Sequence, residues 1–335
     1  MQSDSLSVTT RALDAPATGC GFAGSAFAVA DGDGAVHLIG FDENVVKLPA
    51  HDGAVLAFAT DEKSGGMFTA SDDGSAKRIR ANGELETLHE GRKWVDTICA
   101  SDRGHVAWTV GKTVFFLKKG ADSAVEIETP STASDVAFSP DGKWLGAAVY
   151  GGALLISVAN PDQTKLLPWQ GMHSAIGFSP DGRFCVTAML ENALHVWRID
   201  QPDDKHGRMG GYPAKPLSFA WTADGRYLAS GGADVLVIWP FIKADGPIGQ
   251  NAGVAPADEQ KMVRSVGTRG WSQHIGVGYL DGSVALYDGK TQTYQPIAGP
   301  SDKGPVIDVR FSADARWLGF IREGGEAGLV KLGKP

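Results

Sequence analysis

The sequence predicts an all-β protein that is built from one repeated unit. Its clearest copy is Ala175–Asp200, in which two runs of alternating apolar and polar residues are joined by a Ser-Pro-Asp-Gly turn at 179–182 and a turn at Glu191-Asn192. Alternation with a period of two between such turns is typical of short antiparallel strands. One unit of about three strands leaves its faces unburied, so it requires neighbours of the same kind.

Those neighbours are present in the sequence. A recurring sequence phrase begins at Phe138, Phe178, Trp221 and Phe311. It consists of an aromatic residue, a Ser/Thr-x-Asp turn, a basic residue and a second aromatic residue. The position of Trp197 recurs at a spacing of roughly 40 to 45 residues. Its equivalents are Ile39, Ile79, Leu117, Ser157, Trp239, Tyr287 and Leu332. A period of this length with about four strands per unit predicts a β-propeller.

These repeats resemble those of the WD-repeat β-propellers, and the resemblance extends over nearly the whole chain. It implies a single propeller domain over residues 1–335 with eight four-stranded blades, or seven if the first or third unit is degenerate. In that family, a hydrogen-bonded set of His, Ser or Thr, Asp and Trp holds each blade. The residues that match this set are His51, Thr69 and Asp73 in the second unit, His89 in the third, and Thr187 and Trp197 in the fifth, where Trp169 stands in the place of the His.

The ring is expected to close through the two ends of the sequence. The alternating segment Leu6–Leu13 has no repeat of its own, and the last unit has no outer strand after Leu332. An unpaired sheet edge is prone to unwanted pairing, and closure removes it. We therefore expect residues 1–13 to form the outer strand of the last blade, with Ser5–Leu13 pairing with the strand that contains Leu329–Leu332.

The expected units follow one another without a linker of different composition. The first has strands around Phe22, Ala26–Ala30, Gly34–Ile39 and Val45–Leu48. The others cover His51–Leu88, His89–Val125, Glu126–Leu167, Ala175–Asp200 and Tyr212–Val254, and the last two begin at Gln260 and Gly304. A polar loop follows the fifth unit at residues 201–211. Pro and Gly between 240 and 258 interrupt the outer part of the sixth unit and explain its longer spacing.

Composition and targeting signals limit the possible functions. Of the 335 residues, 43% are hydrophobic and 44 are Gly, which suits short strands and tight turns, and the formal net charge is −8. A negative net charge gives no electrostatic basis for binding nucleic acid. The sequence shows neither a signal peptide nor a run of ~18 apolar residues. We expect a cytoplasmic protein that does not act on a membrane.

Catalytic and metal-binding motifs are not recognisable in the sequence. Gly-x-Ser-x-Gly, His-Glu-x-x-His and Cys-x-x-Cys are missing, and Cys20, Cys99 and Cys185 lie far apart. The stretch from Asp31 to Gly34 imitates the start of a calcium loop, but Asp-Gly also favours a hairpin turn, and the Glu that a calcium loop needs is missing. We therefore expect a protein that is not an enzyme and has no cofactor or metal.

An alternative remains open, in which the protein is an enzyme or binds a cofactor or metal in the central channel of the propeller. Histidines from different blades can meet in such a channel. The first candidate ligands would be His173, His206 and His274.

The resemblance also implies which residues line one rim of the propeller. In the family these stand six and four positions before the first aromatic of the turn phrase and twelve positions after it. Together with Trp94 of a nearby loop, the apolar and basic members are Leu56, Trp94, Tyr150, Met172, Leu190, Lys215, Leu217, Met262, Arg264, Leu280 and Ile307. Aromatic residues, Met and Arg are enriched at protein interfaces. We expect this face to dock an extended or helical segment of another protein that carries an acidic residue, or to join a larger complex, unless several of these side chains turn into the blade cores.

Overall fold

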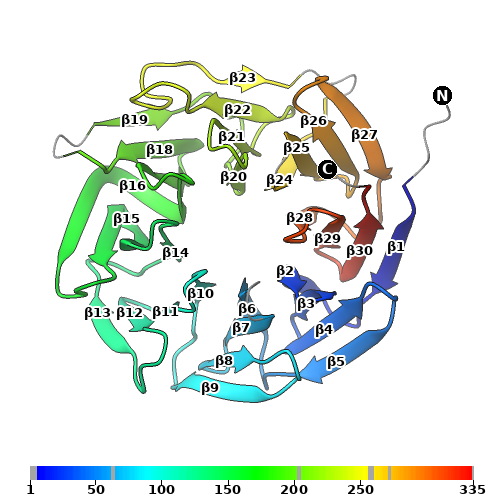
Figure 1. Ribbon diagram of the computed structural model, residues 1–335, viewed down its shortest axis with the longest axis horizontal. Coiled ribbons are helices and arrows are strands. Elements are labelled where there is room, and N and C mark those ends of the chain that lie inside the picture. Colours follow the sequence, from blue (N-terminus) through cyan, green and yellow to red (C-terminus); the bar gives the residue numbers. More distant parts are fainter. Residues whose placement is uncertain (1–5, 62–64, 202–204, 256–259, 271–272, 334–335) are drawn as a thin grey trace.

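Thirty strands make up the regular structure of the computed structural model, which describes residues 6–61, 65–201, 205–255, 260–270 and 273–333. No helix occurs in these ranges, so none is available that could cross a membrane. Figure 1 shows the strands as sheets that surround a central axis, with one edge strand of each sheet nearest to it. The all-β propeller predicted from the repeats is therefore confirmed.

Six of the sheets contain four antiparallel strands each, and their strands are named below in order from the axis outward. The first two are β2 (Ala17–Ala23), β3 (Ala26–Asp31), β4 (Ala35–Gly40) and β5 (Val45–Pro49), then β6 (Val55–Asp61), β7 (Gly66–Ser71), β8 (Ser75–Ile79) and β9 (Leu85–Glu90). The third is β10 (Thr97–Ala100), β11 (Val106–Val110), β12 (Thr113–Leu117) and β13 (Val125–Glu128).

The remaining four-stranded sheets come from the second half of the chain. Two of them are β20 (Phe219–Trp221), β21 (Tyr227–Ser230), β22 (Val237–Pro240) and β23 (Gly253–Val254), then β24 (Val263–Thr268), β25 (His274–Tyr279), β26 (Val284–Asp288) and β27 (Thr293–Ala298). The last is β28 (Val306–Phe311), β29 (Trp317–Arg322), β30 (Glu326–Lys331) and the N-terminal β1 (Val8–Ala12).

The seventh sheet has six strands. In order they are β14 (Asp135–Phe138), β15 (Trp144–Ser157), β16 (Thr164–Phe178), β17 (Phe184–Met189), β18 (Ala193–Arg198) and β19 (His206–Met209). The ring thus has seven hydrogen-bonded sheets, the number predicted as the alternative, and not eight separate four-stranded blades. The prediction of eight is corrected because the fourth and fifth expected units share one sheet.

Two long strands cause this fusion. β16 pairs through Thr164 with Ile156 and through Phe178 with Cys185, so one continuous strand serves both units. β15 turns back at Gly151 and Gly152, whose φ angles are +85° and +146°. Degeneracy of the first or third unit is not the reason, since both form complete four-stranded sheets.

The N-terminal strand closes the ring, as predicted. β1 pairs with β30 from Val8 opposite Val330 to Ala12 opposite Glu326, and Figure 1 shows it at the outer edge of the last sheet. The N–H of Leu13 adds a hydrogen bond of 2.9 Å to the carbonyl of Gly325. Pairing begins at Val8, and Ser5, where it was expected to begin, lies outside the described residues.

Each hydrophobic core lies between two neighbouring sheets or units. On β18, the side chain of Trp197 belongs to the core shared with Leu155 and Ile176, whereas Val196 belongs to the core shared with Leu228 and other residues of the next sheet. Adjacent residues of a strand point to opposite faces, so every middle strand supplies two cores. This is why the middle strands carry buried apolar residues on both faces, as Val196 and Trp197 do.

The repeated turn phrase is a local hydrogen-bonding unit. The hydroxyl of Ser179 donates to Asp181 at 2.6 Å and accepts from the N–H of Phe184 at 3.0 Å, while Gly182 takes a φ of +70°. The same bonds recur at Ser139, Thr222 and Ser312. The phrase therefore recurs because it fixes the hairpin between the first and second strands of a unit.

Candidate functional site

The residues selected for the binding face stand at two kinds of position. Arg264 and Ile307 belong to innermost strands, whereas Leu190 and Leu280 follow directly after second strands. The first strand begins where its antiparallel neighbour ends, so both kinds of position meet at the same end of each unit. Two backbone bonds of 3.0 Å show this, from Leu190 N to Met172 O and from Leu280 N to Met262 O.

Six of the selected residues have exposed apolar side chains. The described residues include thirteen exposed large hydrophobic residues, and six of them are Leu56, Trp94, Tyr150, Leu190, Leu217 and Leu280. Six others lie on outer strands, at Val45, Val46, Leu85, Val125, Leu166 and Val254. Met172, Met262 and Ile307 are half buried, and Ile307 packs against the core between the first and last sheets. The face is therefore apolar, with some of its residues shared with the blade cores.

Part of this face forms a continuous surface, which we call the apolar band. It consists of Tyr150, Met172, Leu190, Leu217, Met262 and Leu280. Tyr150 is paired with Met172 across the fused sheet. At the other end, Leu217, Met262 and Leu280 line a cavity of about 380 Å³ together with Asn192, two residues after Leu190. The band thus runs from the fused sheet across the next two sheets.

Two basic side chains line the same cavity. Lys215 is exposed, and Arg264 is half buried. Burial lowers the pKa of the Arg264 guanidinium, although Glu323 and Asp308 oppose the effect. Among the described residues, no hydrogen bond is made by the Arg264 side chain. The cavity therefore combines an apolar lining with a desolvated positive charge that has room for an anionic partner.

Leu56 and Trp94 lie apart from the band, beside the second sheet. Val55 pairs with Ser71, and the N–H of Val95 donates to the carbonyl of Ser71 at 3.0 Å. The side chain of Trp94 is 61% exposed, and Arg92 and Lys93 before it are also exposed. These residues form a second apolar spot on the face, next to positive charge.

The hydrogen-bonded set of the second unit is centred on His51. Its Nε2 lies 2.8 Å from the hydroxyl of Thr69, and its Nδ1 lies 2.9 Å from Asp73 and 3.0 Å from Ser75. Burial lowers the pKa of His51. Burial opposes the charge on Asp73, but hydrogen bonds from Ser75 and His51 lower its pKa to about 2. A neutral imidazole thus connects the strands of this sheet to an ionised carboxylate.

The fifth unit uses a histidine where Trp169 was expected in its place. The hydroxyl of Thr187 lies 2.7 Å from Nδ1 of His173, and Nε2 of His173 lies 3.0 Å from the carbonyl of Trp169. His173 therefore takes the position that the sequence comparison gave to Trp169. The indole N–H of Trp197 is buried and has no partner among the described residues. His89 lies at the end of β9, where its ring contacts that of Phe115 at 4.7 Å.

Comparison with known proteins agrees with this architecture. No family model matches the chain. WD repeat-containing protein 1-B of Xenopus laevis is 32% identical over 85 residues, which is 25% of this chain and 14% of the relative. Angio-associated migratory cell protein of Canis lupus familiaris is 29% identical over 129 residues, which is 34% of this chain and 29% of the relative. The resemblance to WD-repeat propellers is confirmed. The matched segments span less than a third of either relative.

One hydrogen-bonded set of the WD-repeat kind was missed in the sequence because a tyrosine replaces the histidine. The hydroxyl of Tyr212 lies 2.6 Å from that of Ser230, and the indole N–H of Trp239 donates to Tyr212 at 2.6 Å. Tyr212 precedes Ser230 by 18 residues, the same separation as between His51 and Thr69. The equal spacing and the presence of Trp239 at the repeat position are the sequence features that would have identified this hydrogen-bonded set.

Of the histidines proposed as alternative metal ligands, His173 and His206 both adjoin Trp169, whereas His274 lies on β25 in another sheet. His173 is bonded within the fifth unit, His274 lies 4.0 Å from Asp288, and Nδ1 of His206 lies 3.2 Å from Nε2 of His195. Across the part of the chain that the structure describes, no group of three or more His, Cys, Asp or Glu residues has a metal-binding arrangement. The three candidates are thus not gathered into one site.

Proposed function

We propose that the protein is a non-enzymatic interaction protein that docks a segment of another protein on the apolar band. The observation that carries this proposal is the cavity of about 380 Å³, where exposed Leu217 and Leu280 adjoin the half-buried Arg264. Contiguous apolar surface beside polar groups marks interaction sites on proteins. The similarity to WD-repeat proteins supports the same class of function.

The charge at the cavity indicates the character of the partner. An arginine that is partly desolvated and has no hydrogen-bonded partner among the described residues gains from a carboxylate that can pair with its planar guanidinium. Lys215 adds a second positive charge on the same wall. We therefore propose a partner segment with apolar side chains along the band and an acidic side chain at Arg264.

A capture experiment with two matched variants tests this function. The band variant changes Tyr150, Leu217 and Arg264 to Ala, and the control variant changes the exposed outer-strand residues Val46, Leu85 and Val254 to Ala. A partner captured from cells of the source organism should bind the wild type and the control but not the band variant. Each true hot spot should contribute about 1 to 3 kcal/mol in titrations with the purified partner. Equal binding of the partner to the band variant would refute the band as the site.

A further inference from the structure

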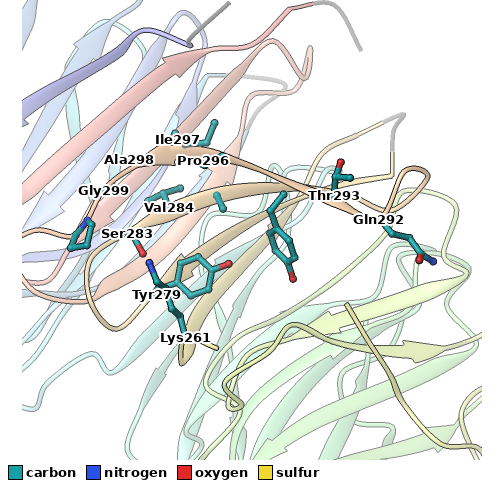
Figure 2. Close-up of a pocket in the computed structure, with 13 residues that line it drawn as sticks. Lys261, Tyr279, Ser283, Val284, Gln292, Thr293, Pro296, Ile297, Ala298 and Gly299 are labelled. Atoms are coloured by element: carbon teal, nitrogen blue, oxygen red, sulfur yellow. The ribbon is translucent and has the colours of Figure 1, made fainter. Parts of the chain in front are cut away.

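A second hollow lies on the outer part of the sheet β24–β27 and shares no lining residue with the cavity of the band. It is a groove of about 720 Å³ that includes Lys261, Tyr279, Gln292, Tyr294, Pro296 and Pro300. Figure 2 shows it along β26 and β27, with Lys261 and Tyr279 near one end and Gln292 and Thr293 near the other. Neither the repeats nor the resemblance indicated this groove.

Among the described residues, the groove adjoins a neighbouring sheet whose outer strand is short. Its outer strand β23 has only two residues, which pair with Val237 and Ile238, whereas β27 has six. Tyr279 and Tyr294 pack against the edge of the core between these two sheets and stay half exposed. The described residues of the short outer strand thus do not fully cover the adjoining tyrosine face of β25–β27.

Three phenol groups at this face have no hydrogen-bond partner among the described residues. The hydroxyls of Tyr279, Tyr287 and Tyr294 form no hydrogen bond with the described residues, although Tyr287 is only 3% exposed. The rings of Tyr287 and Tyr294 lie 4.9 Å apart. Burial raises the pKa of all three, that of Tyr279 to about 12, so they stay protonated at neutral pH. The face therefore presents ring surfaces together with hydroxyl donors.

The charge of the groove argues against a charged occupant. Among the described residues that line it, Lys261 is the one with a full charge, and its ammonium group lies 3.4 Å from the carboxylate of Asp281. That positive charge is already balanced. The described lining therefore offers an occupant aromatic rings and prolines together with hydroxyl donors.

We propose that this groove binds a proline-rich segment of another protein in the polyproline II conformation. Such a segment exposes carbonyl acceptors and brings no backbone N–H at its prolines, which complements the unpaired tyrosine hydroxyls. Its pyrrolidine rings pack on aromatic side chains, and little conformational entropy is lost because the chain is already extended. The proposal does not depend on the function proposed for the apolar band.

Calorimetric titration of the full chain with a decaproline peptide tests the proposal. Tyr279→Phe and Tyr294→Phe each remove one hydroxyl and keep the ring, so we expect each to weaken binding about two- to tenfold, the equivalent of one hydrogen bond. Tyr294→Ala, which also removes the ring, should weaken binding further. Tyr227→Phe is the matched control in another sheet and should leave the affinity unchanged.

Two controls distinguish peptide binding at this groove from binding at the apolar band. A glycine-serine decapeptide should not bind, and the band variant should bind decaproline like the wild type. The proposal is overturned by absence of decaproline binding up to about 1 mM, by equal binding of the glycine-serine peptide, or by unchanged affinity of both phenylalanine variants. Loss of decaproline binding in the band variant would also overturn it, because the peptide would then occupy the other site.

Discussion

The carboxylate of Asp135 accepts a hydrogen bond of 2.9 Å from the backbone N–H of Ile176, which joins β14 to the inner end of β16. Its other oxygen accepts from the N–H of Val136 at 2.9 Å and from the hydroxyl of Thr97 on β10 at 3.3 Å. One acidic side chain therefore connects three innermost strands of the ring. This is a connection between units, whereas the sets around His51 and Tyr212 act within a unit.

Asp135 should make the protein less stable as the pH rises from about 4 to about 6. Burial raises its pKa from 3.8 to about 6, although the three hydrogen bonds oppose this shift. A pKa that is higher in the folded state means that protonation favours folding. The stabilisation is complete below the unfolded pKa and is lost as the pH rises through the folded pKa. A shift of two units corresponds to at most about 3 kcal/mol.

Denaturant unfolding of the wild type and Asp135→Asn between about pH 4 and about pH 7 measures this contribution. The free energy of unfolding of the wild type minus that of the variant should fall by about 1 to 3 kcal/mol as the pH rises across this range. Asp181→Asn is the control. Burial opposes the charge of Asp181, but hydrogen bonds from Ser179 and Arg183 lower its pKa, so its contribution is instead lost as the pH falls. A constant difference for Asp135→Asn would contradict the assignment.

Features that depend on neighbouring residues, or on two segments that each lack a partner, were predictable from the sequence. The turn at Ser179 to Gly182 is held by bonds within six residues, so its sequence signature survives in four units. The closing pair β1 and β30 was predictable because both segments lacked a partner. The positions of Leu190 and Leu280 were implied by the resemblance to WD-repeat propellers, by counting twelve residues from the turn phrase.

Features that depend on contacts between distant residues were not predictable. Pro168 and Gly171 suggest a break between the fourth and fifth units, yet β16 continues through both, because Pro168 pairs with Gly152 without interrupting the strand. The cavity needs Asn192, Leu217 and Met262, which come from three successive units. The groove at Tyr294 adjoins β23, which has only two residues, and the repeat does not indicate so short an outer strand.

Tyr212→Phe should destabilise the protein by about 1 to 3 kcal/mol, because it leaves the hydroxyl of Ser230 and the indole N–H of Trp239 buried without their partner. Tyr227→Phe removes a hydroxyl that forms no hydrogen bond with the described residues, so it should change stability by less than about 0.5 kcal/mol. Equal effects of the two changes in chemical denaturation would show that Tyr212 does not hold its sheet together.

Gly152→Ala should destabilise the fused sheet. A Cβ at this position would collide with the carbonyl of Leu167, and the φ of +146° is one that only Gly adopts without strain. The strain alone should cost about 1 to 3 kcal/mol. Gly299→Ala, where a Cβ would meet nothing within 4 Å, is the control. Similar melting temperatures for the two variants would contradict the turn described within β15.

Deletion of residues 1–13 should lower stability by several kcal/mol, a large share of the ~5 to 15 typical of a domain. It removes β1 and exposes the edge of β30 along five paired positions, from Val330 to Glu326. Deletion of residues 1–5 alone keeps β1 and serves as the control. If the longer deletion melts within a degree or two of the full chain, the pairing does not close the ring in solution.

Leu217→Ala should weaken partner binding more than Trp94→Ala, although Trp94 is the larger and more exposed residue. Leu217 is 47% exposed and lines the cavity beside Arg264, where a partner side chain can be buried on several sides. Hot spots concentrate in such enclosed places, and exposed residues at the margin contribute less. We expect a loss of about 1 to 3 kcal/mol for Leu217→Ala and less than about 1 kcal/mol for Trp94→Ala. Titration of both variants with the captured partner measures the two losses, and melting curves check that both are folded. The opposite order would move the site to the second apolar spot at Leu56 and Trp94.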